Sequence, residues 1–433
     1  MQRMTSLEQY VRFLQRMERV SAAALRRHQR RQLEKLLRHA RQTVPFYRER
    51  LDPLFRPDET VDWRRWGEIP ILTRQDLLDR PDDLASRAVP KAHGRVSEAC
   101  TSGSTGEIVK TMRTSLVLTL WAAITTRYYD WHGIDCTRKL ASIRGESLGT
   151  ADYPEGRRRK GWALQDGTVV SLNVTTPIHL QAEWLARERP DYLLSFATNL
   201  GALADFIGRS PAYGPRFPLA GIMSCSEMLS DEAREACLRT FGVPVADNYS
   251  SEECGYMALQ CPEHDVYHEQ SEALLLELLD DDEVPAPQGA LGRVVATPLY
   301  NYAMPLIRYE MRDYAVAGEA CACGRTAPVL TRIAGRSRNL FRFPGGIVVQ
   351  PNIKTVNFMT YLRPRQWQVI QTAPLKIEVH LVPGEDPATM DFDGMERYIR
   401  ELLHADLEVE FKLVDAIPVS PGGKHEDYVC ALP

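Results

Sequence analysis

The sequence lacks a long hydrophobic run, a secretory signal and a strong excess of either charge. It has no stretch of about 18 apolar residues, so we expect no membrane-spanning helix. The longest apolar stretch, near residues 116–124, suits a buried helix instead. The N-terminus has none of the charged, apolar and small-residue zones of a signal peptide. These absences favour a cytoplasmic protein with no membrane partner.

The charge balance and the cysteine content narrow the class of partner. The 433 residues include 53 Lys and Arg against 57 Asp and Glu, which gives a formal net charge of -4. Dedicated nucleic-acid binders usually carry a strongly basic domain, so we expect no nucleic-acid partner. Nine cysteines, an odd number in a long chain, fit reduced thiols better than a disulfide framework. The near-neutral charge fits a small-molecule ligand. We expect a monomer or homodimer.

Hydrophobic patterning predicts an α/β protein. Residues 1–50 are Arg-rich with leucines at helical spacing, which predicts amphipathic helices. From about residue 95, short β-like runs alternate with helix-like stretches such as 178–189 and 230–241, a pattern typical of an α/β layer architecture with a partly parallel sheet. Beyond about residue 339, further strands and one helix predict a separate α+β unit.

A Ser/Thr/Gly-rich segment is the most informative motif. Its residues are Thr101, Ser102, Gly103, Ser104, Thr105 and Gly106. Glycines allow close approach to a ligand, and hydroxyl and backbone N–H groups can surround phosphate oxygens. No Gly-Lys-Ser/Thr follows at the spacing of a Walker A loop. On composition alone, the segment is equally typical of a surface turn.

Four further segments follow this one, and the set resembles a known superfamily. The segments are Thr101–Gly106 with Lys110, Asn248–Glu253, Ile307–Asp313, Gly335–Asn339 and Pro421–Lys424. In this order they resemble the motifs of the adenylate-forming enzymes, which include acyl-CoA synthetases, peptide-synthetase adenylation domains and luciferases. The resemblance is greatest to the phenylacetate-CoA ligase and coenzyme F390 synthetase branch, and it covers nearly the whole chain.

The resemblance implies a fold and a reaction. Residues 1–337, of which 1–94 are mainly helical, would form a large domain of mixed sheets flanked by helices. Residues 338–433 would form a small mobile α+β domain. The reaction would use ATP and Mg²⁺ to convert a carboxylic acid, with an aromatic acid favoured, to an acyl-adenylate, and coenzyme A would then accept the acyl group. Two alternatives stay open: an amine or hydrazine acceptor, and a non-catalytic scaffold that keeps the fold.

The resemblance also assigns roles to residues. Tyr249 would stack on adenine, and Asp313 would accept hydrogen bonds from the ribose hydroxyls. Glu253 would hold Mg²⁺, a cation that prefers oxygen ligands. Lys424 would stabilise charge at the reacting carboxylate and α-phosphate. The remaining residues implied in binding ATP or AMP, beyond 101–106, are Lys110, Ser226, Glu227, Asn248, Ser250 and Arg336.

The sequence departs from the motifs of the superfamily at two places. The usual Gly after the aromatic residue is Ser250, and the usual Ser or Thr before the metal-binding Glu is Glu252, which leaves open whether Glu252 joins the metal site. At the hinge, Arg338 and Asn339 replace two aspartates. A hinge needs backbone freedom more than a particular side chain, so rotation is still expected.

A cluster of thiol and imidazole side chains suggests a metal site. Cysteine and histidine are the preferred ligands of structural Zn²⁺. The candidates are Cys254, Cys261, His264, His268, Cys321 and Cys323. By the resemblance, Cys261, His268, Cys321 and Cys323 form the set, and His264 is the alternate for His268. The competing interpretation is three unrelated buried thiols and a surface histidine.

Two further sites rest on weaker signals. The acid pocket would include Phe196, Ala197, Ser224 and Tyr129, which are equally typical of core packing. The basic run 157–160 is a candidate for binding coenzyme A phosphates, although a solvated loop is the favoured interpretation.

Overall fold

The computed structural model describes residues 6–100, 109–145, 153–162, 165–210, 218–336, 340–345, 347–349, 351, 353, 355–417 and 427–432. The α-helices in this part of the chain are α1 (Leu7–Met17), α2 (Ala22–Thr43), α3 (Arg74–Asp79), α4 (Pro81–Leu84), α5 (Ser115–Trp131), α6 (Ile178–Glu188), α7 (Ala197–Arg209), α8 (Asp231–Phe241), α9 (Thr355–Tyr361) and α10 (Phe392–Leu402). Among the described residues, no helix is long and apolar enough to cross a membrane.

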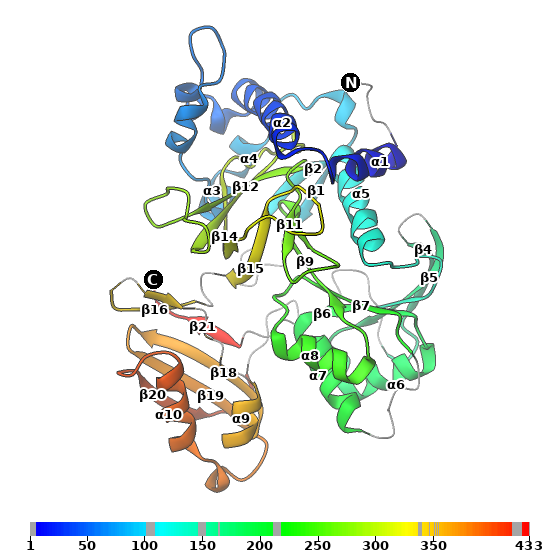
Figure 1. Ribbon diagram of the computed structural model, residues 1–433, viewed down its shortest axis with the longest axis vertical. Helices are drawn as coiled ribbons and strands as arrows, with labels where there is room; N and C mark the ends of the chain where they lie inside the picture. Colours follow the sequence, from blue (N-terminus) through cyan, green and yellow to red (C-terminus); the bar gives the residue numbers. More distant parts are fainter. Residues whose placement is uncertain are drawn as a thin grey trace.

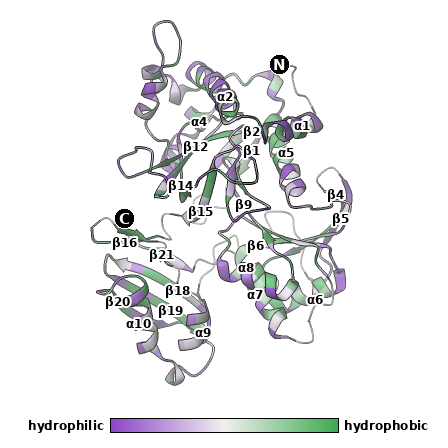
Figure 2. Cartoon of the chain, in the orientation of Figure 1, coloured by the Kyte–Doolittle hydropathy of each residue, from purple (hydrophilic) through white to green (hydrophobic). Residues whose placement is uncertain are grey.

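The N-terminal segment forms the predicted amphipathic helices. Ser6 and Gln9 make a capping box at the start of α1, which satisfies backbone N–H groups that have no partner within the helix. In α2, Leu33, Leu36, Leu37 and Ala40 are buried and recur at helical spacing. The helix lies over the large domain, and its exposed basic residues are purple in Figure 2.

The middle of the chain forms a mostly parallel sheet with helices beside it, as predicted (Figure 1). In spatial order its strands are β4 (Arg157–Trp162), β5 (Gln165–Asn173), β3 (Leu140–Arg144), β6 (Tyr192–Phe196), β7 (Gly221–Cys225) and β8 (Val245–Ala246). Helices α6, α7 and α8 supply residues to its core, including Trp184, Leu200 and Cys237. The prediction of a loop at 157–160 is wrong: these residues are exposed, but they form the edge strand β4. Charged side chains on an edge strand discourage pairing with other chains.

A second sheet is antiparallel and carries the motif residues. In spatial order its strands are β12 (Leu274–Leu279), β13 (Leu291–Pro298), β14 (Tyr309–Ala317), β15 (Val329–Arg336), β11 (Tyr267–Glu269), β10 (Gly255–Gln260) and β9 (Asn248–Ser251). The hairpin of β1 (Val96–Cys100) and β2 (Lys110–Thr114) leads into α5. Motif residues that are far apart in the sequence thus belong to one sheet: β9 begins at Asn248, and β15 ends at Arg336.

Residues beyond 339 build their own core. The strands β20 (Glu408–Leu413), β19 (Lys376–Pro383), β18 (Pro364–Ala373) and β21 (Tyr428–Cys430) form one sheet beside the hairpin of β16 (Phe341–Phe343) and β17 (Ile347–Val349). The core includes Phe341, Phe358 and Ile399. The buried Gln371 side chain accepts from the Arg342 backbone N–H (2.7 Å) and donates to the Arg342 carbonyl (2.8 Å). This pair of hydrogen bonds attaches β16 to the sheet.

A buried arginine holds α5 between α1 and the antiparallel sheet. Arg127 is 3% exposed, and its guanidinium lies 2.5 Å from Glu272 and 3.3 Å from Glu18. It also donates to Gln270 (2.8 Å) and to the carbonyl of Leu14. A buried charge is tolerated only when it is paired and hydrogen-bonded, as it is here.

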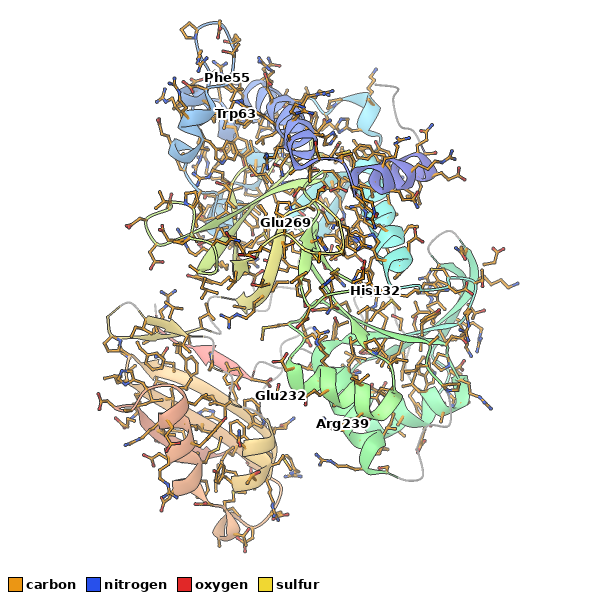
Figure 3. The ribbon with its side chains drawn as sticks, viewed as in Figure 1. Phe55, Trp63, His132, Glu232, Arg239 and Glu269 are labelled. Carbon is orange, nitrogen blue, oxygen red and sulfur yellow. The ribbon has the colours of Figure 1, made fainter. Side chains whose placement is uncertain are left out.

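We expect Arg127→Ala to destabilise the large domain. Loss of the guanidinium leaves the Glu272 carboxylate buried without its partner, at a cost of about 3–5 kcal/mol. The midpoint of urea unfolding, followed by tryptophan fluorescence, should fall accordingly. Arg239→Ala is the matched control, because Arg239 pairs with Glu235 on the surface of α8 with both side chains more than half exposed (Figure 3). An equal shift in the two variants would contradict the role of Arg127.

Stability should also fall in mild acid because of His132, at the end of α5 (Figure 3). Burial lowers the pKa of His132 to about 4 from the ordinary value of 6.5. The unfolded chain therefore takes up a proton below pH 6.5 that the folded chain takes up only near pH 4. From this residue alone we expect a loss of about 2 kcal/mol by pH 5. Thermal unfolding at pH 7 and pH 5 measures it, and His132→Gln should show a smaller loss than the wild type.

Candidate active site

Two of the predicted nucleotide-binding residues contact each other across the antiparallel sheet. The Tyr249 hydroxyl donates to Asp313 Oδ2 (2.7 Å), although the residues are 64 positions apart in the sequence. Tyr249 is 8% exposed, and Asp313 lies half-buried on β14. Asp313 pairs with Arg336 in the β14–β15 register; the Arg336 side chain lies outside the described part of the chain. An aromatic ring beside a carboxylate is an arrangement able to hold a nucleoside.

The adjacent glutamates 252 and 253 face different arginines. Glu253 Oε1 lies 3.9 Å from Arg74 Nη1, and its side chain is 11% exposed. Glu252 Oε2 lies 3.2 Å from Arg113 Nη1, and its side chain is 45% exposed. Burial, and next the Glu253 charge, raise the pKa values of Cys254 and Tyr309. The two carboxylates thus occupy distinct environments, so a ligand that meets one need not meet the other.

A polar network connects the ends of the two sheets. Ser224 is fully buried, and its hydroxyl donates to Asp247, which also accepts from Tyr267 (2.5 Å). Asn248 donates to the Ser224 carbonyl (3.1 Å) and accepts from the Ser250 hydroxyl (2.9 Å). These bonds position the strand that carries Tyr249, and they engage Ser224, one of the acid-pocket candidates, in a structural contact.

The residues after β7 form a turn beside this network. Ser226 is exposed and has a positive φ of 63°, a conformation that is uncommon outside glycine. Glu227 accepts from the backbone N–H (3.0 Å) and the hydroxyl (2.7 Å) of Thr198 at the start of α7. This arrangement places a carboxylate at a helix N-terminus, where the helix dipole favours it.

The other acid-pocket candidates are mainly buried. Phe196 and Ala197 are 5% and 1% exposed, and Ala197 belongs to the core beneath α7. Tyr129 packs edge-on against Trp162 with ring centroids 5.3 Å apart, and burial raises its pKa. These residues stay predictions for the acid site. The outward face of α5, which the sequence did not single out, lines a cavity instead.

Several predicted residues fall outside the described part of the chain: 101–106, the hinge residues 337–339 and Lys424. Lys110 is described; it is exposed at the start of β2. Two arginines outside the predicted motifs, Arg74 and Arg113, contact the glutamates. Arg74 directly follows the N-cap Thr73, and Arg113 lies on the strand after the phosphate-type segment. These positions in the sequence are the features that could have pointed to the two arginines, but neither residue belongs to a recognisable motif.

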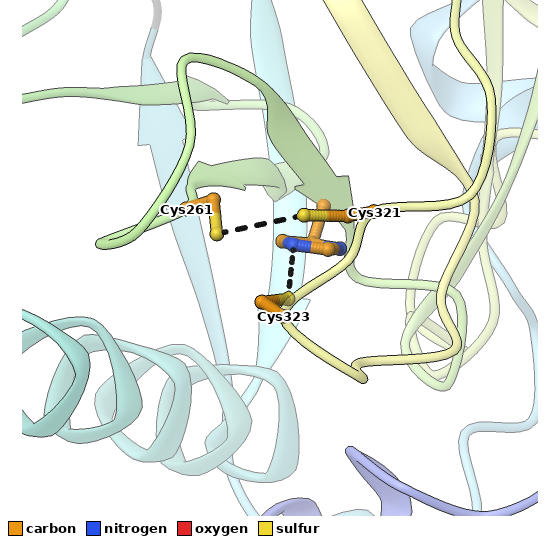
Figure 4. Close-up of side chains that lie close together, drawn as sticks. Cys261, Cys321 and Cys323 are labelled. Atoms are coloured by element: carbon orange, nitrogen blue, oxygen red, sulfur yellow. Dashed lines mark hydrogen bonds between the residues drawn. The ribbon is translucent and has the colours of Figure 1, made fainter.

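The thiol and imidazole candidates come together in one group (Figure 4). The ligand atoms of Cys261, His268, Cys321 and Cys323 all lie within 4.8 Å of one another. Cys261 Sγ is 3.9 Å from Cys321 Sγ, and Cys323 Sγ is 3.3 Å from His268 Nε2. The alternate ligand His264 lies 3.4 Å from Cys321 Sγ but is exposed, whereas His268 is buried. Four N and S donors at these separations could hold one metal ion.

The electrostatics of this group differ between its thiols. Burial raises the pKa of Cys321 to about 11. Burial opposes ionisation of Cys323 too, but hydrogen bonds from the Arg325 backbone and side chain outweigh it and lower the pKa of that thiol. Arg325 also lies over the Trp131 ring (4.3 Å), and Trp131 meets His268 edge-on at 5.8 Å. The group is therefore packed directly against the end of α5.

Comparison with known proteins agrees with the motif resemblance. No protein-family model matches the chain. The phenylacetate-coenzyme A ligase of Pseudomonas putida is 28% identical over 307 residues, which cover 69% of this chain and 67% of that protein. The predicted resemblance to the phenylacetate-CoA ligase branch of the adenylate-forming enzymes is thereby confirmed.

Solved structures with lower identity share the fold. A 2-hydroxyisobutyryl-CoA ligase in the postadenylation state, bound to 2-HIB-AMP, has a TM-score of 0.74 at 17% identity, covering 96% of this chain and 91% of its own. The same ligase in its thioesterification state has a TM-score of 0.61. The amide bond synthetase McbA of Marinactinospora thermotolerans has a TM-score of 0.52 at 17% identity, covering 75% and 67%. The predicted fold class is confirmed: the chain has the fold of adenylate-forming ligases.

Proposed function

We propose that this chain is an AMP-forming acid–CoA ligase, which activates a carboxylic acid with ATP and transfers the acyl group to coenzyme A. The observation that carries the proposal is the hydrogen bond between Tyr249 and Asp313. Tyr249 lies four residues before Glu253 in the sequence. The chain is also similar to a phenylacetate-coenzyme A ligase. An aromatic acid is the favoured substrate class, because that relative is named for one.

The first half-reaction joins the acid to AMP. An oxygen of the substrate carboxylate attacks the α-phosphorus of ATP, the bond to the β-phosphate oxygen breaks, and pyrophosphate leaves with that electron pair. Tyr249 and Asp313 would position adenine and ribose. The half-buried Glu253 carboxylate is the better candidate to hold Mg²⁺, which supplies charge neutralisation at the phosphates. Lys424 would stabilise charge on the transferring oxygens.

The second half-reaction would need the C-terminal unit, 338–433, to rotate and carry Lys424 away. Support comes from its separate core and from the solved neighbour, which matches this chain better in its postadenylation state than in its thioesterification state. The coenzyme A thiol would then attack the acyl carbonyl and release AMP. The exposed basic strand β4 stays a candidate contact for coenzyme A phosphates.

An amine acceptor is the second candidate, because the amide bond synthetase shares the fold. One experiment separates the three interpretations: ATP–pyrophosphate exchange with a panel of acids, followed by addition of coenzyme A or amines. Acid-dependent exchange followed by thioester formation supports the ligase. Exchange with amide formation but no thioester supports the second candidate, and no exchange with any acid supports a non-catalytic scaffold.

We expect Lys424→Ala to lower the rate of acyl-adenylate formation by at least 10²-fold, because one positioned charge at a reacting oxygen contributes about 3 kcal/mol. Pyrophosphate exchange measures this rate. Lys412→Ala is the control, since Lys412 lies in the same part of the chain and pairs with Glu378 at the surface (2.8 Å). Adenylation at the wild-type rate in Lys424→Ala would remove the lysine from the mechanism.

We also propose that Cys261, His268, Cys321 and Cys323 hold a structural Zn²⁺. The support is the convergence of four donors from the loop after β10, from β11 and from the loop after β14. A zinc ion would tie these segments together without a catalytic part, and a cytoplasmic location would keep the thiols reduced.

Elemental analysis should find about one zinc per chain. Cys321→Ser should lose most of it and unfold at a lower temperature, because the remaining three donors leave the tetrahedron incomplete. Cys430→Ser is the control: Cys430 is buried in the C-terminal core and donates to Gln371 (3.3 Å), a contact that serine can keep. Full zinc content in Cys321→Ser would contradict the assignment.

A further inference from the structure

A polar cavity of about 510 Å³, the interface cavity, lies where the large domain meets the C-terminal unit. Its carboxylates all belong to the large domain: Asp281, Glu283, Glu310 and Asp313. Two arginines and a tyrosine complete that side: Arg293, Arg312 and Tyr314. The remaining lining residue, Arg342, lies on β16 in the C-terminal unit. The interface cavity is therefore shared by two units that the proposed reaction requires to move relative to each other.

The large-domain side of the interface cavity has an excess of negative charge. Four carboxylates and two arginines line it, which leaves two negative charges without a counterpart among the lining residues. Arg293 is already engaged, since Nη1 lies 3.0 Å from Glu310 Oε1 and Nη2 lies 4.0 Å from Glu283 Oε1. An arginine that enters from the other unit therefore meets a surface of complementary charge.

Arg342 brings a positive charge to this surface from the C-terminal sheet. Its backbone N–H and carbonyl both bond to the Gln371 side chain (2.7 and 2.8 Å), so the guanidinium moves with that sheet. Burial raises the pKa of Tyr314, and the charge of the nearby Arg342 opposes this rise. Beside them, Leu340 packs with Tyr314 and Ala334. This apolar contact excludes water next to the charged one, which strengthens the attraction.

We propose that Arg342 is a positioning residue: its guanidinium, inserted among the carboxylates of the large domain, holds the C-terminal unit in the orientation that this structure has. The inference rests on the proposed function, whose second half-reaction requires the unit to leave that orientation. Asp281 and Glu283 are exposed, so the contact can break without leaving those two carboxylates buried and unpaired. Asp313 lines the same cavity, so the contact is made next to the proposed ribose ligand.

Arg342→Gln should release the C-terminal unit from this orientation. Energy transfer between dyes on unnatural amino acids, which replace the exposed Arg239 of α8 and Asp393 of α10, measures the orientations without substrate. The ratio of this orientation to all others should fall about threefold, the scale of a partly exposed ion pair. Arg342→Lys should keep most of it, because the charge is kept. The control is Arg363→Gln, which breaks a surface pair with Glu385 in the C-terminal unit and should change nothing.

The exposed carboxylates provide an independent test. Asp281→Asn together with Glu283→Gln should lower the same ratio, because the charge that attracts Arg342 is reduced. These two substitutions should have little further effect in the Arg342→Gln variant, where the guanidinium is already absent. Fully additive effects of the two sets would contradict a direct contact. Both carboxylates lie in an exposed turn, so these variants should fold even if Arg342→Gln does not.

The two half-reactions separate positioning from a merely structural role. With phenylacetate as the probe acid, Arg342→Gln should slow pyrophosphate exchange about threefold, because the proposed cycle assigns adenylation to this orientation. Thioester formation from preformed phenylacetyl-adenylate should not slow. Equal losses in both half-reactions with a lower unfolding temperature would overturn the proposal. An unchanged energy-transfer distribution would also overturn it, and that measurement keeps its meaning even if no acid supports exchange and the proposed function fails.

Discussion

The burial of the Arg127 charge is the constraint on which the arrangement of the large domain depends. Such a charge can leave water only if Glu272, Glu18 and the Leu14 carbonyl surround it, which fixes α1, α5 and the antiparallel sheet against one another. The helix so fixed presents Trp121 to the cavity along α5 and Trp131 to His268. The cavity wall at Trp121 and the metal-binding group at His268 therefore share α5 as a common support.

The adjacent residues Glu252 and Glu253 have different surroundings. At positions 252 and 253, two carboxylates one residue apart meet two arginines that come from distant parts of the chain. Both residues lie in the turn between the end of β9 at Ser251 and the start of β10 at Gly255. The departure from the usual Ser or Thr at position 252 thus adds a carboxylate next to the cavity along α5 while Glu253 keeps its separate environment.

Elements that depend on local sequence patterns could be predicted, whereas contacts between residues far apart in the sequence could not. The leucine spacing in residues 1–50 and the helix-like stretches 178–189 and 230–241 carry strong local signals, and α2, α6 and α8 form there. The grouping of Cys261 with Cys321 followed from the resemblance and not from spacing. The pairing of Arg113 with Glu252 spans 139 residues and leaves no pattern in the sequence. The strand at 157–160 was missed because four consecutive cations resemble a solvated loop until a neighbouring strand supplies hydrogen bonds.

The hydrogen bonds of Gln371 have a consequence for the proposed rotation. Because its amide binds both the N–H and the carbonyl of Arg342, the hairpin of β16 and β17 is attached to the C-terminal sheet and belongs to that unit. The turning point of the proposed rotation would then lie after the end of β15 at Arg336 and before the start of β16 at Phe341. In the proposed rotation, the β16–β17 hairpin would therefore turn as one body with the C-terminal sheet.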